Sequence, residues 1–114
     1  MKRRTVLVTG GGRGLGRAIS TAFGTCGDRV AVFYRADEAS ALAVRQEIEE
    51  AGGEGAVFQA DVWDPKAVDA GLVEAVSRFG PLDVCVANAG ITRDALLVQT
   101  TEETWDEVVG TNLT

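Results

Sequence analysis

The sequence predicts an α/β protein built on a doubly wound parallel sheet. Short apolar runs rich in β-branched residues alternate with stretches of helical period, and a glycine-rich segment joins the first run to the first helical stretch. No internal repeat or low-complexity linker interrupts this alternation. A chain of 114 residues forms one domain at most, so we expect a single domain over residues 1–114.

Four strands are expected, each an unbroken apolar run of the kind that a parallel sheet buries on both faces. The runs are Thr5–Thr9, Arg29–Tyr34, Gly55–Ala60 and Leu82–Ala87. In the usual order of a doubly wound sheet they take the arrangement 3-2-1-4, with a binding crevice between strands one and four. A sheet that ends there leaves strand four as an exposed apolar edge, so we expect the chain to self-associate.

The first helical stretch has one apolar stripe, and Gly27 ends it. The stripe consists of Leu15, Ala18, Ile19, Ala22, Phe23 and Cys26. We expect Cys26 and Cys85 to be buried thiols rather than a disulfide, because both lie in apolar patterns without C-x-x-C spacing.

The later helices have clearer ends. Asp37 can cap a helix that runs to about Ala51, and Asp64 with a proline directly after it is a strong start signal for a third helix. Gly80-Pro81 closes that helix. A capping box at residues 100–103 precedes a last helix, after a loop that begins near Asn88.

Composition excludes several classes of function. The net charge of −6 argues against a nucleic-acid surface, and no stretch of about 18 uncharged apolar residues is present to span a membrane. The basic start at residues 1–4 resembles that of a signal peptide, but the apolar run behind it is too short, so we expect a cytoplasmic protein. The chain has no histidine, which excludes Ser-His-Asp chemistry and most transition-metal sites.

The glycine-rich segment has the character of a phosphate-binding loop. It runs Thr9-Gly10-Gly11-Gly12-Arg13-Gly14-Leu15-Gly16 between a strand and a helix. Free amide groups and the dipole at a helix start attract anions, and glycine lets a pyrophosphate approach the main chain. The spacing is not G-x-G-x-x-G, and no Gly-Lys-Ser/Thr follows as in a P-loop. It fits Thr-Gly-x-x-x-Gly-x-Gly, with a flexible turn as the alternative.

Other polar and small residues follow the remaining strands. They are Tyr34-Arg35, Asp61-Val62 and Asn88-Ala89-Gly90. Ligands of open α/β sheets bind outside the carboxyl ends of the strands, at the point where the strand order reverses. The residues that follow all four strands are therefore expected to lie together and form one dinucleotide site.

These segments resemble successive landmarks of the short-chain dehydrogenase/reductase family. The strings are TGGGRGLG, ADVWD, ANAGITRD and WDEVVGTNLT, and they are most similar to those of the 3-oxoacyl-acyl carrier protein reductases. The resemblance covers essentially the whole chain. It implies the first half of a Rossmann-type fold that binds NADP.

The resemblance also implies a role for each site residue. Gly10, Gly14 and Gly16 shape the pyrophosphate turn, to which Gly11, Gly12, Arg13 and Leu15 also belong, and Thr9 ties the loop toward strand four. Asp61 and Val62 hold the adenine, and Asn88, Ala89 and Gly90 lie near the nicotinamide ribose. Asn112 is the catalytic residue implied within this chain, since it bends the last helix and anchors a proton-relay water.

Structural alternatives stand beside two of these interpretations. Asp61 can serve only as a turn residue, and Asn112 can belong to a purely structural polar network. We expect Trp63 and Trp105 to supply bulk in the core or at an interface.

The end of strand two indicates a preference for NADP(H). NAD-specific members of the fold place an acidic residue there, where this chain has Tyr34. Arg35 and Arg13 can converge on the 2′-phosphate, unless they are two ordinary exposed arginines. We expect Asp37 and Glu38 to point to the helix N-terminus rather than to the ribose.

The resemblance implies an NADPH-dependent reductase of 3-oxoacyl thioesters, small or carrier-bound, that forms family-type tetramers. The family's catalytic serine and Tyr-x-x-x-Lys have no counterpart here, because the single tyrosine, Tyr34, is followed four positions on by Glu38. We therefore expect an N-terminal fragment that is inactive alone. The alternative is a non-catalytic module of the same fold that senses a dinucleotide.

Overall fold

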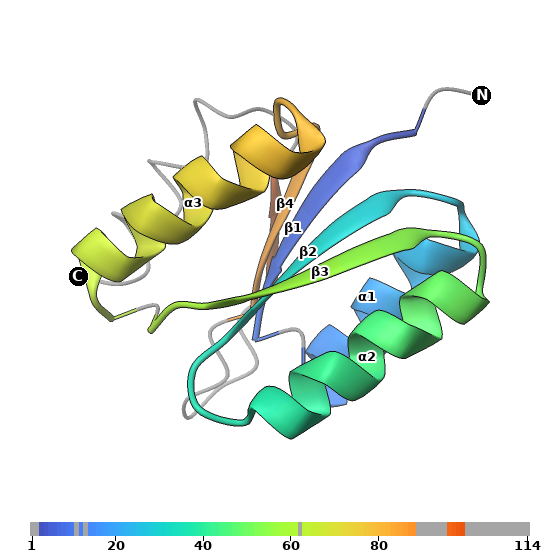
Figure 1. The fold of residues 1–114 in the computed structure, drawn as a ribbon, viewed down its shortest axis with the longest axis horizontal. Coiled ribbons are helices and arrows are strands. Elements are labelled where there is room, and N and C mark those ends of the chain that lie inside the picture. Colours follow the sequence, from blue (N-terminus) through green and yellow to red (C-terminus); the bar gives the residue numbers. More distant parts are fainter. Residues whose placement is uncertain (1–2, 11, 13, 62, 89–95, 100–114) are drawn as a thin grey trace.

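The fold is a twisted sheet with helices on both faces, as the computed structural model shows for residues 3–10, 12, 14–61, 63–88 and 96–99 (Figure 1). The elements are β1 (Thr5–Thr9), α1 (Gly14–Thr25), β2 (Arg29–Tyr34), α2 (Glu38–Glu50), β3 (Glu54–Gln59), α3 (Pro65–Phe79), β4 (Val84–Asn88) and β5 (Leu96–Gln99). The predicted alternation of strands and helices is confirmed as far as β4.

The strand order is β3-β2-β1-β4-β5. β1 pairs in parallel with β2 and with β4, and β2 pairs in parallel with β3. The predicted doubly wound arrangement 3-2-1-4 is thereby confirmed.

β5 was not predicted. It lies antiparallel against β4, where the sequence suggested a loop, and its register runs from Cys85↔Gln99 to Asn88↔Leu96. Because β5 supplies partners to the outer ladder groups of β4, the prediction that strand four is an exposed edge was wrong. The expected last helix lies outside the described residues.

The sheet buries its two faces against different helices (Figure 1). The pleat sends alternate strand residues to opposite faces. One cluster joins Val6, Val8, Val30, Val32, Val84 and Val86 to the α2 residues Ala41, Val44 and Ile48. The other cluster joins Leu7, Ala31, Phe33, Ala56, Phe58 and Cys85 to the α3 residues Val68, Ala75 and Phe79. The phenyl rings of Phe33 and Phe58 meet edge to face with centroids 5.9 Å apart.

The predicted apolar stripe of α1 is largely wrong. The buried residues of this helix are Gly16, Ser20 and Gly24, whereas Leu15, Ala18 and Ala22 are exposed. Close packing against α2 explains the difference, because a Cβ on Gly24 would lie 3.0 Å from the Cα of Ile48. Within the predicted stripe, Ile19 and Phe23 are half-buried. They pack against the cluster that the sheet valines form with α2.

Two further burial predictions need correction. Cys26, directly after the end of α1, is exposed, while Cys85 is buried as expected. Trp63 is 45% exposed, so it does not lie in the core, and its role at an interface stays a prediction. Trp105 lies outside the described residues.

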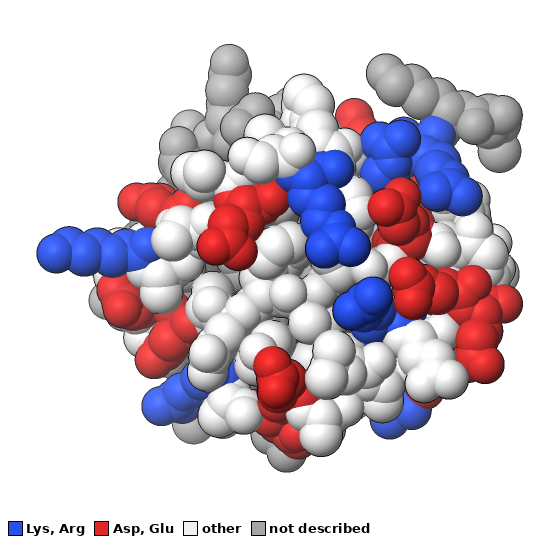
Figure 2. Space-filling view, in the orientation of Figure 1, with Lys and Arg blue, Asp and Glu red and all other residues white. Residues whose placement is uncertain are grey.

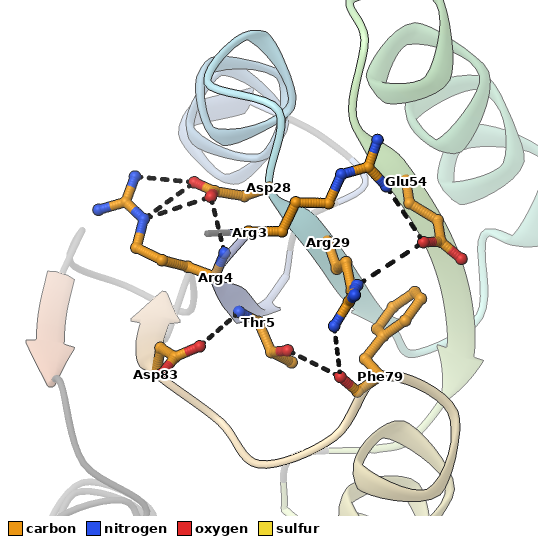
Figure 3. A network of polar contacts seen from close by, with 8 residues as sticks. All are labelled: Arg3, Arg4, Thr5, Asp28, Arg29, Glu54, Phe79 and Asp83. Atoms are coloured by element: carbon orange, nitrogen blue, oxygen red, sulfur yellow. Dashed lines mark hydrogen bonds and ion pairs between the residues drawn. The ribbon is translucent and has the colours of Figure 1, made fainter. Parts of the chain in front are cut away.

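A polar network closes the amino end of the sheet, where β1 begins (Figure 3). Arg4 donates to the buried carboxylate of Asp28, with Nη2 2.7 Å from Oδ2, and its backbone N–H donates to Oδ1 at 3.1 Å. The backbone N–H of Thr5 donates to Asp83 at 2.8 Å, and the Thr5 hydroxyl donates to the carbonyl of Phe79 at 3.0 Å. This network ties the first strand to the segments around it, at the end of the sheet opposite the glycine loop.

Candidate dinucleotide site

The carboxyl ends of the parallel strands lie side by side because the strands are in register. Thr9 pairs with Phe33 on one side and with Ala87 on the other, and Tyr34 pairs with Gln59. The residues that follow these strands therefore start from one edge of the sheet. This edge is the place where open α/β sheets bind their ligands.

The glycine loop leaves β1 through backbone conformations that favour glycine. Gly10 has φ 64° and Gly14, the first residue of α1, has φ 57°. The N–H of Gly10 donates to the carbonyl of Phe33 at 3.1 Å, which fixes the start of the loop beside β2. Gly12 is buried, and a Cβ there would lie 3.4 Å from the backbone nitrogen of Ala41. The loop therefore runs close against the first turn of α2.

The start of α1 is open toward solvent. Thr9 is buried at the end of β1 and Gly16 is buried in α1, whereas Leu15 is 45% exposed. The exposed helix start and the glycines before it suit an anion, since the first amide groups of a helix have no partner within it. Gly11 and Arg13 lie outside the described residues.

The end of β2 carries two side-chain pairs. The hydroxyl of Tyr34 donates to Oε2 of Glu38 at 3.1 Å. Arg35, with 74% of its side chain exposed, has its Nε 3.8 Å from Oδ2 of Asp61, the residue predicted to hold the adenine. The structure thus brings Tyr34, Arg35 and Asp61 together at this edge.

Asp61 also serves as a turn residue, which is the structural alternative for this position. Its Oδ1 accepts the backbone N–H of Trp63 at 2.9 Å, which is a turn typical of aspartate. One carboxylate oxygen thus shapes the turn, while the other faces Arg35.

One of the remaining predicted site residues, Asn88, lies in a described strand. Asn88 is the last residue of β4 and pairs with Leu96. Val62, Ala89, Gly90 and Asn112 lie outside the described residues.

Sequence reasoning missed Glu38 as a neighbour of this edge. Asp37 is the N-cap, as expected, and its carboxylate accepts the N–H of Ser40 at 3.0 Å and the Ser40 hydroxyl at 2.6 Å. The Glu38 carboxylate instead meets Tyr34, so the prediction that it points to the helix N-terminus was wrong. The spacing of four residues between a tyrosine at a strand end and a glutamate in a helix's first turn is the signal that could have found the pair.

Partial burial raises the pKa of the Tyr34 hydroxyl, and Glu38 raises it further. A tyrosine that gives up a proton in catalysis needs the opposite shift, which a neighbouring cation supplies. Tyr34 is therefore not suited to act as the proton donor of a reductase.

Charges of both signs are mixed on the face of the molecule that Figure 2 shows. Among residues 3–10, 12, 14–61, 63–88 and 96–99, no group of three His, Cys, Asp or Glu side chains is placed to hold a metal ion. Within the same residues, no helix has the length and hydropathy needed to cross a bilayer.

The sequence of residues 4–114 matches the short chain dehydrogenase family, and the chain belongs to this family. The class of protein is therefore that of the short chain dehydrogenases.

Two named reductases are similar to this chain. The 3-oxoacyl-[acyl-carrier-protein] reductase FabG of Staphylococcus aureus is 46% identical over 110 residues, and FabG of Staphylococcus epidermidis is 44% identical over 110 residues. Each alignment covers 96% of this chain and 45% of the relative. The chain thus spans a little under half the length of these relatives.

Solved structures agree with the fold. A dehydrogenase/reductase from Sinorhizobium meliloti 1021 matches with a TM-score of 0.78 and 40% identity, covering 95% of this chain and 43% of that one. An NADH-dependent reductase solved as a complex with NAD matches with a TM-score of 0.73 and 31% identity, covering 79% of this chain and 37% of that one. One solved structure of similar fold is therefore that of a reductase described as NADH-dependent.

Proposed function

We propose that this chain is the N-terminal, cofactor-binding half of an NADPH-dependent reductase that converts 3-oxoacyl thioesters to 3-hydroxyacyl thioesters. The observation that carries the proposal is the joint placement of the glycine loop, Tyr34-Arg35 and Asp61 at one sheet edge. The similarity to FabG supports the substrate class. As in that class, the substrate is small or carrier-bound, the full-length enzyme is a homo-oligomer, and it works in the cytoplasm.

The loop from Thr9 to Gly16 is proposed to hold the pyrophosphate. Positive φ at Gly10 and Gly14 fits this role, because these conformations disfavour residues with a Cβ. Arg35, with Arg13 from the loop, is proposed to bind the 2′-phosphate of NADPH. The side chain of Arg35 is 74% exposed, and its Nε lies 3.8 Å from Oδ2 of Asp61, which is a weak ion pair. The guanidinium group is therefore available to bind a doubly charged phosphate.

Other residues are proposed to position the two ends of the cofactor. Asp61 and Val62 hold the adenine, and Asn88, Ala89 and Gly90 lie along the nicotinamide ribose. Asn112 anchors a water in the proton relay. NADPH supplies the hydride when bound, while the protein must supply the proton donor.

The proton donor is proposed to lie outside these 114 residues, in a segment with a serine and Tyr-x-x-x-Lys. A second candidate function is a dinucleotide sensor of the same fold, which would bind the cofactor at the same edge without turnover. Reading the coding sequence beyond Thr114 separates the two. The serine and Tyr-x-x-x-Lys support the reductase, and a stop codon or a substituted tyrosine supports the sensor.

The cofactor preference is tested by titrating NADPH and NADH into the wild type and Arg35→Asp in a calorimeter. We expect the wild type to bind NADPH roughly five- to tenfold more tightly, and this preference to weaken with added salt because exposed charges are screened. Arg35→Asp should remove or reverse the preference. Tighter binding of NADH to the wild type, or an unchanged ratio in the variant, contradicts the proposal.

A further inference from the structure

We propose that Glu38 is a specificity-determining residue, whose carboxylate is held beside the 2′-phosphate position by Tyr34 and limits the preference for NADPH over NADH. The inference rests on the proposed function, because it concerns the strength with which the same site discriminates between the two cofactors. It assigns a role to a residue that the family landmarks leave out.

The position of Glu38 is fixed by Tyr34. Tyr34 is the last residue of β2, and its hydroxyl donates to Oε2 of Glu38 at 3.1 Å. Glu38 is the first residue of α2, so the contact spans the turn between the strand and the helix. The raised pKa of the Tyr34 hydroxyl keeps it protonated, and therefore a donor, throughout the neutral range.

The first turn of α2 lies against the glycine loop. A Cβ on Gly12 would be 3.4 Å from the nitrogen of Ala41, and the N–H of Ala41 donates to the carbonyl of Asp37 at 3.2 Å. The loop itself begins beside β2, through the bond from Gly10 to Phe33. Glu38 thus lies in a helical turn that borders both the glycine loop and the end of β2.

The charge of Glu38 is not balanced by an ion pair within the described part of the chain, where its partner is the neutral Tyr34 hydroxyl. The neighbouring acids differ in this respect. Asp37 accepts two hydrogen bonds from Ser40 as the helix cap, and Asp61 faces Arg35. Glu38 therefore contributes the least compensated negative charge at this edge among the described residues.

The two cofactors respond to this charge in opposite ways. The 2′-phosphate of NADPH brings negative charge toward a carboxylate and is repelled by it, whereas the 2′-hydroxyl of NADH can donate a hydrogen bond to a carboxylate. Exposed charge interactions change affinity by a few-fold, so we expect Glu38 to lower the preference for the phosphate about threefold.

The test uses 2′,5′-ADP and 5′-AMP, which differ only by the 2′-phosphate, so that no turnover is needed. Calorimetric titrations give the ratio of the two dissociation constants for the wild type, for Glu38→Gln and for Glu50→Gln. The last variant is the matched control, because it removes the same charge from the exposed far end of the same helix. Circular dichroism of each variant verifies that the fold is kept.

We expect the preference for 2′,5′-ADP to rise about threefold in Glu38→Gln, to stay within error in Glu50→Gln, and to change less at high salt. Tyr34→Phe should change the ratio of the two dissociation constants in the wild-type background. It should not change this ratio in the Glu38→Gln background, because the Tyr34 hydroxyl acts through the Glu38 carboxylate. An unchanged ratio in Glu38→Gln, or an equal rise in Glu50→Gln, overturns the inference alone. Failure of the wild type to bind either ligand overturns the proposed function and the inference with it.

Discussion

Gly53 offers a sharp test of how closely three segments of this fold approach one another. A Cβ at this position would lie 2.7 Å from the carbonyl oxygen of Asp28, 2.8 Å from the Cα of Gly24 and 3.0 Å from the carbonyl oxygen of Gly24. All three atoms belong to the backbone, at the start of β2 and the end of α1. A rotamer change cannot relieve these contacts, so either the segments move apart or the strain remains.

Gly53→Ala should therefore fall at the upper end of overpacking costs, and we expect it to reduce the free energy of unfolding by about 3 kcal/mol. Gly52→Ala is the matched control. Gly52 has φ 106° but nothing within 4 Å of a Cβ, so its substitution adds backbone strain without a clash and should cost about 1–2 kcal/mol.

Guanidinium unfolding followed by far-ultraviolet circular dichroism measures both variants against the wild type. We expect a lower midpoint for Gly53→Ala than for Gly52→Ala. If Gly53→Ala is as stable as Gly52→Ala or more so, the close approach of the three segments is refuted.

Three further predictions concern the thiols, an ion pair and catalysis. A thiol reagent should label only the exposed Cys26 in the folded chain and both cysteines after unfolding. The reason is that Cys85 is buried and that burial raises its pKa. Fast labelling of Cys85 in the folded variant Cys26→Ser would contradict this prediction. Hydrogen bonds from Arg17 lower the pKa of Glu47. Glu47 should therefore stabilise the fold above its ordinary pKa of about 4.3 and lose this effect as the pH falls through its folded-state value. Urea unfolding of the wild type and Glu47→Gln across pH 2–7 should show a stability difference that vanishes in acid, and a constant difference refutes the pairing. The 114-residue chain alone should not oxidise NADPH with an acetoacetyl thioester, and rates well above background would show that it holds its own proton donor.

The central part of the fold was predictable because its patterns are local. Unbroken apolar runs marked the parallel strands, and Asp37 and Asp64 cap their helices as their side-chain chemistry suggests. The parallel register of β2 and β3 places Arg35 and Asp61 at one edge of the sheet. This proximity follows from the strand assignments alone.

The errors arose where packing between elements decides the outcome. β5 has only four residues and forms because β4 offers an open ladder, which no local pattern reveals. The small residues of α1 turn inward because α2 approaches closely at Gly24, so Leu15 and Cys26 remain outside. The contact between Tyr34 and Glu38 depends on the path of the turn between β2 and α2.

We propose that the carboxyl edge of the sheet binds the adenosine and phosphate part of NADPH. Amide chemical shifts recorded by nuclear magnetic resonance during titration with 2′,5′-ADP test it most directly, because each amide reports its own surroundings. We expect the largest shifts at Gly10, Gly14 and Arg35, with little change around Asp28 and Asp83 at the opposite end of the sheet. Shifts concentrated at that opposite end, or no saturable shifts at all, would contradict it.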